Sequence, residues 1–186
     1  MEFHIKVLPN GEFSQWLATT ANIGDTLMLQ GPFGSCIYSG DAEQTMLLAA
    51  TGTGLAPILG IARDALAQQH SGDIQLVVAA NSADDLYLVD ELKVLAASHE
   101  QIKLHFVLRN AEQTNSKLEA EADDAMFNAD VYAWCKQQWP TLKGWRIFLC
   151  GNTSFVGKMR KQCFMSGANM RDISSDIFLP FGQPMA

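Results

Sequence analysis

The feature that most constrains the fold is an alternation that begins near Thr45. Short apolar runs of strand length are separated by longer segments in which apolar residues recur at helical spacing. Such alternation is typical of repeated βαβ units, in which parallel strands form one sheet and helices cover its faces. The helices are expected to start near Pro57, Asp84, Asp130 and Ser154. We therefore predict an α/β domain with a five-stranded, parallel, doubly wound sheet, whose strands span residues 46–50, 74–80, 102–108, 146–150 and 173–179.

Residues 1–38 carry a different pattern. Apolar and polar side chains alternate over residues 3–7, Asn10 and Gly11 form a turn signal, and residues 26–30 have the composition of a short strand. These features predict antiparallel β structure. Small barrels, closed or partly open, need at least about five strands, so we expect this part to be the tail of a domain whose beginning is absent.

The segment Thr51-Gly52-Thr53-Gly54-Leu55-Ala56-Pro57 follows a buried strand and opens a helix. The free backbone N–H groups and the dipole of a helix N-terminus attract phosphate, and glycines let the backbone approach a ligand closely. Pro57 suits the first helical turn, where its missing N–H is not needed. The ordinary dinucleotide fingerprint is GxGxxG, and proline stands here at its third glycine. On this segment alone, a purely structural tight turn is about as good an interpretation as a phosphate site.

Charge and cysteine usage exclude several classes of protein. The 13 basic and 20 acidic residues give a net charge of -7, which argues against nucleic-acid binding because phosphate neutralisation needs concentrated positive charge. The four cysteines show no CxxC spacing, so neither zinc nor an iron-sulfur centre is expected, and reduced thiols fit a cytoplasmic location. The uncharged run over residues 45–62 is interrupted at its centre by Gly and Pro, so no membrane span is expected.

Five motifs follow one another along the chain. They are found at residues 11–17 (Gly-Glu-Phe-Ser, then Trp-Leu), 24–34 (Gly-Asp, then Gly-Pro-Phe-Gly), 52–57 (Gly-Thr-Gly-Leu-Ala-Pro), 85–92 (Asp-Leu-Tyr, then Asp-Glu-Leu) and 150–178 (Cys-Gly-Asn, then Asp-Ile-Phe). In this order they resemble the ferredoxin-NADP reductase superfamily over essentially the entire chain. The ordered combination is far more specific than any one motif.

The resemblance implies a flavoprotein that passes a hydride between NADH or NADPH and FAD, then sends electrons singly to an iron-sulfur, haem or oxygenase partner. The hydride chemistry belongs to the cofactors, and the protein aligns them. The resemblance further implies that residues 1–40 are a remnant of an FAD-binding β-barrel and that residues 41–186 are the NAD(P)-binding domain.

The site residues follow from the same motifs. Cys150, predicted to be catalytic, would lie beside the nicotinamide ring, although an isolated cysteine at a strand end is more often a small buried apolar residue. Phe178 and Phe181 are candidates to cover a flavin face, although aromatic residues more often close a core. The remaining predicted cofactor contacts are Gly52, Thr53, Gly54 and Pro57 for the pyrophosphate, Asn81 and Asp85 for the adenosine ribose, Gly151 and Asn152 for the nicotinamide, and Gly11 and Ser14 for the flavin.

The chain also departs from the family pattern. The motif of Arg, an aromatic residue and Ser or Thr that grips the flavin does not occur, so tight FAD binding by this chain alone is not expected. Residues 80–84, where the family often has Arg, hold acidic Asp84 and no cation, which favours NADH over NADPH. Thr153 stands where the family usually has Pro.

Three alternatives remain open at this point. The first is that the chain is the product of a truncated or mis-started reading frame, with Met1 not the natural start. The second is that it is a non-catalytic nucleotide-binding subunit. The third is that another polypeptide, including a second copy in a homo-oligomer, completes the β segment and covers its open edges.

Overall fold

The computed structural model of the chain describes residues 2–31, 33–110 and 126–179, and these form two compact units. The first unit is Met1–Ser35 and the second is Cys36–Ala186. Each unit is described by itself. The domain boundary expected after residue 40 stays a prediction.

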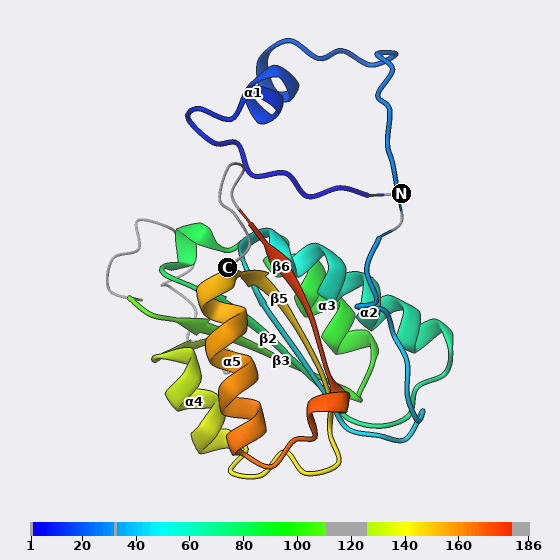
Figure 1. The fold of residues 1–186 in the computed structure, drawn as a ribbon, viewed down its shortest axis with the longest axis vertical. Helices are drawn as coiled ribbons and strands as arrows, with labels where there is room; N and C mark the ends of the chain where they lie inside the picture. Colours follow the sequence, from blue (N-terminus) through cyan, green and yellow to red (C-terminus); the bar gives the residue numbers. More distant parts are fainter. Residues whose placement is uncertain (1, 32, 111–125, 180–186) are drawn as a thin grey trace. The chain divides into compact units, whose positions relative to one another are not determined.

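The second unit is built on a six-stranded sheet in which all the strands are parallel (Figure 1). The strands are β1 (Met46–Thr51), β2 (Ile74–Ala80), β3 (Ile102–Leu108), β4 (Met126–Asn128), β5 (Arg146–Asn152) and β6 (Ile173–Phe178), in the spatial order β4-β3-β2-β1-β5-β6. The predicted α/β class and parallel sheet are confirmed. The prediction of five strands missed β4, because three residues are too few to show a strand pattern and only their pairing with β3 identifies them.

Helices cover both faces of this sheet, as a doubly wound fold requires (Figure 1). They are α2 (Leu55–Ala67), α3 (Val89–Ser98), α4 (Val131–Gln138) and α5 (Thr153–Met165). One buried cluster joins α2 and α3 to the sheet through residues such as Ile58, Leu92 and Phe106. A second cluster joins α4 and α5 to the opposite face through residues such as Trp134 and Met159. The strands can therefore be apolar on both sides, which is why they stand out as continuous apolar runs.

The predicted helix starts agree with the structure in three places and differ in one. The starts of α2, α4 and α5 lie within two residues of the expected positions, and the Asp130 carboxylate caps α4 by accepting hydrogen bonds from two backbone N–H groups. The helix expected near Asp84 begins only at Val89. Residues 83–85 form a short 3-10 turn instead, and Leu88 separates it from α3 with a positive φ of 57°. A left-handed residue interrupts a helix, so the acidic pair belongs to the turn.

The first unit contains one helix, α1 (Glu12–Thr19), and its described residues include no strand. The strands predicted over residues 3–7 and 26–30 are therefore wrong for this structure. Alternation reports which side chains suit a sheet, whereas a strand also needs a neighbouring edge for its N–H and C=O groups, and the described residues of this unit provide none. The predicted turn is present, since Gly11 N–H donates to the Leu8 carbonyl at 3.1 Å, but it leads into α1.

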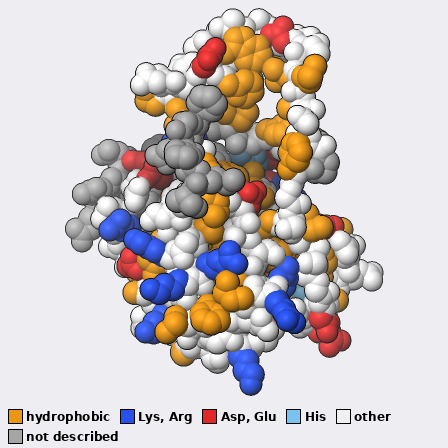
Figure 2. Space-filling view, viewed as in Figure 1, with side chains coloured by type: hydrophobic (Ala, Val, Ile, Leu, Met, Phe, Trp, Pro, Cys, Tyr) orange, Lys and Arg blue, Asp and Glu red, His pale blue; other side chains and the backbone are white. Residues whose placement is uncertain are grey.

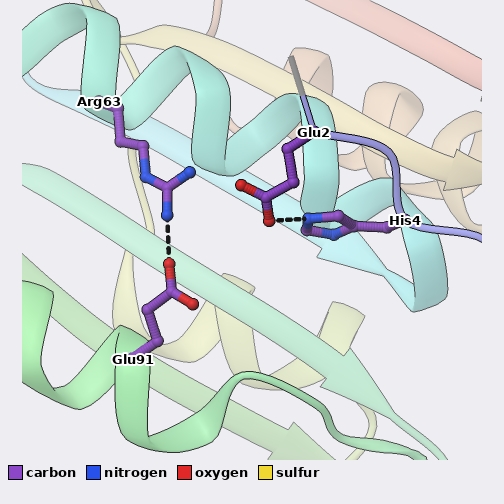
Figure 3. Close-up of polar contacts among 4 residues, drawn as sticks. All are labelled: Glu2, His4, Arg63 and Glu91. Carbon is purple, nitrogen blue, oxygen red and sulfur yellow. Dashed lines mark hydrogen bonds and ion pairs between the residues drawn. The ribbon is translucent and has the colours of Figure 1, made fainter. Parts of the chain in front are cut away.

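Each unit contains a close polar contact between a basic and an acidic side chain. In the second unit the Arg63 guanidinium on α2 donates to the Glu91 carboxylate on α3, and in the first unit the His4 ring lies 2.7 Å from the Glu2 carboxylate (Figure 3). None of the helices in the described part of the chain has the length and apolar character that a membrane crossing requires.

Candidate functional site

The strand order locates the candidate site at the carboxyl ends of β1 and β5. From β1 the chain proceeds outward through β2, β3 and β4, and it then returns to place β5 and β6 on the other side of β1. The connections that leave β1 and β5 therefore go to opposite faces of the sheet, into α2 and α5. Ligands of open α/β sheets bind in the crevice at such a switch point. The topology thus brings together two predicted groups, residues 52–57 and residues 150–152.

The two connections meet backbone to backbone. A Cβ atom added to Gly54 would lie 2.7 Å from the Gly151 nitrogen and closer still to the Cys150 carbonyl oxygen. Gly151 has a φ of 149°, and a Cβ there would overlap the Thr51 hydroxyl. Both positions therefore require glycine, and the close approach fixes the end of β1 against the end of β5.

Next to this junction lies a group without a protein partner. The Thr51 Oγ1 atom is buried and has no hydrogen-bond partner among the described residues. Buried hydroxyls are usually satisfied, so an unpaired one at a ligand-binding edge marks a place for a polar group of a ligand. Beside it Gly52 has a φ of 53°, and nothing lies within 4 Å of its Cβ position. This arrangement leaves room for a nucleotide to approach the backbone.

The start of α2 supplies donors at the same place. A 3-10 turn at Gly52–Gly54 leads into the helix, and no side chain caps its first N–H groups. Pro57 lies in the first turn, where it has no N–H to lose, and Thr53 is half-buried. Uncapped N–H groups and the helix dipole suit a diphosphate, so the residues present fit a dinucleotide.

The start of α5 is arranged differently. The Asn152 side chain accepts a hydrogen bond of 2.9 Å from the Phe155 N–H, so it caps its own helix. Its neighbour Thr153, where proline was expected from the family, is the first helical residue. Asn152 pairs with Phe178 at the end of β6, which places this half-buried ring at the same edge of the sheet. Phe181 lies outside the described residues.

Cys150 is fully buried on β5, between Ala50 and Asp176 of the neighbouring strands. Its Sγ lies 3.9 Å from the Sγ of Cys36. The hydrogen bond between these thiols and the burial of the side chain raise the pKa of Cys150 well above its ordinary value. Cys150 is therefore a neutral thiol at physiological pH, which suits an uncharged contact with a ligand. Its catalytic assignment stays a prediction.

The predicted ribose contacts follow β2. Asn81 and Asp85 are exposed, and the Asp85 carboxylate accepts bonds of 3.3 Å from both the N–H and the hydroxyl of Ser82. Arg109, which sequence reasoning missed, lies beside Asn81 because the chain after β3 continues in parallel with the chain after β2. The Arg109 N–H donates to the Ala80 carbonyl at 3.0 Å. Its position immediately after an apolar run was the available signal.

The predicted flavin contacts belong to the first unit. Ser14 is buried, its hydroxyl donates to the Gly11 carbonyl at 3.1 Å, and it accepts a bond of 3.1 Å from the Leu8 N–H. The hydroxyl thus shapes the turn that leads into α1. Among the described residues, His, Cys, Asp and Glu side chains form no group of three or more that could hold a metal ion.

The fold and this edge define a nucleotide-binding α/β domain, and comparison with known proteins gives its family. A family profile described as an oxidoreductase NAD-binding domain matches residues 48–161, and one described as an oxidoreductase FAD-binding domain matches residues 1–38. The chain belongs to the oxidoreductase NAD-binding domain family, within the ferredoxin-NADP reductase superfamily that its motif order indicates.

Individual relatives agree with this family. The chain is 30% identical over 182 residues to the ferredoxin--NAD(P)(+) reductase component of a naphthalene 1,2-dioxygenase system from Pseudomonas putida, covering 98% of this chain and 53% of the relative. It is 32% identical over 115 residues to methane monooxygenase component C from Methylosinus trichosporium, covering 62% and 34%. A crystal structure of the Amycolatopsis cytochrome P450 reductase GcoB is similar with a TM-score of 0.80 and 26% identity, covering 95% of this chain and 51% of that chain. The chain thus spans about half the length of those relatives that match nearly all of it.

Proposed function

We propose that the chain is the nucleotide-binding module of a flavin-dependent oxidoreductase, which binds NADH or NADPH at the ends of β1 and β5 and passes hydride to FAD. The observation that carries this proposal is the backbone junction between Gly54 and Gly151, with the unpaired Thr51 hydroxyl beside it. Such a junction holds two ligand-binding loops in one fixed relation, as alignment of a dinucleotide requires.

The chain's own residues would divide the work along the nucleotide. Gly52 and the uncapped N–H groups at the start of α2 would hold the diphosphate. The Thr51 hydroxyl would bond the part of the nucleotide next to the junction. The neutral Cys150 thiol would present an uncharged wall to the nicotinamide, and the burial around it would exclude water. When bound, the reduced nicotinamide supplies the hydride and the flavin accepts it.

Coenzyme preference would be set at the ends of β2 and β3. The exposed Asp84 and Asp85 disfavour a 2′-phosphate, whereas Arg109, whose backbone lies beside the end of β2, carries a cation that would suit one. We infer that the chain accepts NADH and retains measurable affinity for NADPH through Arg109. Arg109→Gln should then weaken NADPH binding more than NADH binding, as followed by titration with each coenzyme. An equal effect on both would contradict this role.

Residues 1–40 would form part of an FAD-binding β-barrel. The match of residues 1–38 to the FAD-binding family supports this assignment. So does the exposure of apolar side chains there, which include Phe3, Ile23, Met28 and Phe33, because strands of a barrel would cover such side chains. Further β structure beyond these residues would complete the flavin site.

The electron acceptor would be an acidic protein. The names of the relatives associate them with dioxygenase, monooxygenase and cytochrome P450 systems. Helices α4 and α5 carry exposed Lys136, Lys158, Arg160 and Lys161 and contain no Asp or Glu, although the chain as a whole is acidic. Figure 2 shows Lys and Arg side chains over this face. Charge of this kind steers an acidic partner, so acceptor reduction should slow as salt is raised. The free cysteines fit a reducing, cytoplasmic setting for such a system.

A matched pair of glycine variants tests nucleotide binding. Gly52 and Gly144 both have positive φ, of 53° and 81°, and neither has an atom within 4 Å of its Cβ position, but only Gly52 lies at the candidate site. Gly52→Val and Gly144→Val should therefore cost similar stability, of about 1–2 kcal/mol. The wild-type and Gly144→Val proteins should show a higher Tm with NADH, and Gly52→Val should not. If NADH and NADPH leave the wild-type Tm unchanged at millimolar concentration, the proposal fails.

Flavin dependence is tested separately, with FAD added to the purified chain. A flavin absorption band that NADH bleaches would support hydride transfer. Nucleotide binding without flavin reduction would instead favour a non-catalytic nucleotide-binding subunit, or a chain that needs another polypeptide to complete the flavin site.

A further inference from the structure

The chain enters the second unit on the face of the sheet that α2 and α3 cover. Cys36 and Tyr38 pack against the buried cluster that α2 and α3 cover. Ser39 is held by Arg146 at the start of β5, through bonds of 3.2 Å to its carbonyl and 3.0 Å to its hydroxyl. The Tyr38 hydroxyl lies 3.1 Å from the Nδ1 atom of the buried His70. These contacts fix the segment at Ser39 and Tyr38 and leave Cys36 at its far end, opposite Cys150.

The separation of the two thiols is close to that needed for a bond. Their Sγ atoms lie 3.9 Å apart, whereas a disulfide holds its sulfur atoms at about 2.05 Å. Cys150 is fixed in a central strand between two neighbours. Cys36 is half-buried in a segment without regular structure, directly after the boundary between the two units. The small closure that remains can therefore come from the Cys36 side alone.

The chemistry of the pair is asymmetric. A hydrogen bond donated by the Cys150 thiol lowers the pKa of Cys36, and the positive charge of Arg146 lowers it further, against the opposing effects of burial and of Asp176. Cys36 is also the more exposed of the two. The remaining cysteines, Cys135 and Cys163, are buried in the other cluster, where burial raises the pKa of both thiols. Only Cys36 combines a lowered pKa with access to solvent, which is what oxidants select.

We propose that Cys36 and Cys150 form an oxidative modification site, at which hydrogen peroxide converts the two thiols into an intramolecular disulfide. The Cys36 thiolate attacks one peroxide oxygen, so that an S–O bond forms, the O–O bond breaks and hydroxide leaves as water after protonation. The Cys150 sulfur then attacks the Cys36 sulfenic acid, losing its proton, so that the S–S bond forms and a second water leaves. Two thiols are oxidised by two electrons in total and one peroxide is reduced to two waters.

The consequence for nucleotide binding rests on the proposed function. Cys150 precedes Gly151, whose backbone contacts Gly54, and a bond from Cys36 would convert the thiol that the proposed function places beside the nicotinamide into a disulfide. Oxidised protein should therefore bind NADH about tenfold more weakly or worse. A reductant such as dithiothreitol should restore the affinity.

The disulfide is tested without reference to nucleotide binding. The full chain is treated with hydrogen peroxide, and free thiols are counted after denaturation while linked peptides are mapped by mass spectrometry. We expect the thiol count to fall from four to two, with one linked peptide pair that joins Cys36 to Cys150. Cys36→Ala should abolish the link, and the matched variant Cys163→Ala should retain it. Both variants should keep the NADH-induced rise in Tm.

Three results would overturn the inference: a link between any other pair of cysteines, disulfide-linked dimers, or sulfinic and sulfonic acids at Cys36 with no link. If the reduced chain does not bind NADH, the proposed function fails, but the peptide map still decides whether the disulfide forms.

Discussion

The two units of this chain differ in how far they bury their apolar side chains. Residues 36–179 place theirs in two buried clusters, one on each face of a continuous sheet. In the described part of residues 1–35, Ser14 is the one buried residue, while large apolar side chains such as Leu29 and Met28 are exposed. The first unit has a composition suited to a sheet without the partners that would bury it. Apolar composition stabilises structure only where the chain also supplies a surface to pack against.

The strongest test of this contrast makes the same substitution in both units. Leu48 is fully buried on β1, and Leu29 is 62% exposed. Leu48→Ala should lower the free energy of unfolding by about 3 kcal/mol because it leaves a cavity, whereas Leu29→Ala should change it by less than about 0.5 kcal/mol. Urea denaturation of both variants measures the difference. A large loss at Leu29 would break the comparison, since it would mean that residues 1–35 are covered in solution.

A pair of glycine variants sharpens the contrast within the second unit. Gly54→Ala drives a Cβ into the Cys150 carbonyl and should destabilise the protein by about 2–3 kcal/mol. Gly60→Ala, on the exposed face of α2 with open space around it, should instead stabilise it by up to about 1 kcal/mol. Thermal unfolding followed by circular dichroism distinguishes the two signs. Equal effects would show that the backbone junction is not tightly packed.

The aromatic cluster beside β3 should make the stability of the second unit depend on pH. His105 packs against Phe127, Trp134 and Trp139, its Nε2 lies 2.8 Å from the Gln75 Oε1, and burial lowers its pKa from 6.5 to about 4. The unfolded chain therefore binds this proton at a higher pH than the folded chain does. The stabilisation is complete above pH 6.5 and is lost as the pH falls towards 4.

The loss should amount to about 1–2 kcal/mol, after allowance for the partial exposure of the ring. Unfolding free energies of wild type and His105→Gln, measured from pH 7 to pH 4, should diverge over this interval, with the steeper fall in the wild type. Parallel curves would exclude His105 as the cause.

The smallest effect concerns the surface. Arg63 and Glu91 join α2 to α3 with both side chains nearly half exposed (Figure 3). A double-mutant cycle with Arg63→Ala and Glu91→Ala should give a coupling energy of about 0.5 kcal/mol that decreases with salt. A coupling energy comparable to the unfolding free energy lost in Leu48→Ala would mean that surface charge, and not core burial, accounts for the difference between the two units.

Sequence reasoning succeeded where a local pattern and its tertiary environment agree. Strands buried on both faces are mostly apolar, and this character revealed β1, β2, β3 and β5. The cap of α4 is a local bond of Asp130, so it too was visible. Residues 3–7 have an equally good strand pattern, but a pattern does not reveal whether a neighbouring strand is present.

The candidate site was predictable in its parts but not in its assembly. The glycines of residues 52–54 and 151 could be recognised individually, whereas their mutual contact depends on which strands are neighbours. Arg109 and Cys36 were missed for the same reason. The role proposed for Arg109 depends on its position beside Asn81, and the role proposed for Cys36 depends on its position beside Cys150. No sequence motif spans either separation.

The glycine-to-glycine contact also bears on how this domain could be re-engineered. Because the ends of β1 and β5 approach each other through main-chain atoms, neither Gly54 nor Gly151 can be given a side chain without displacing its neighbours. Changes of coenzyme choice are therefore best made at the ends of β2 and β3, where the side chains of Asn81, Asp84, Asp85 and Arg109 are exposed. An engineered library would therefore keep the Gly54–Gly151 junction constant and vary only the ends of the neighbouring strands.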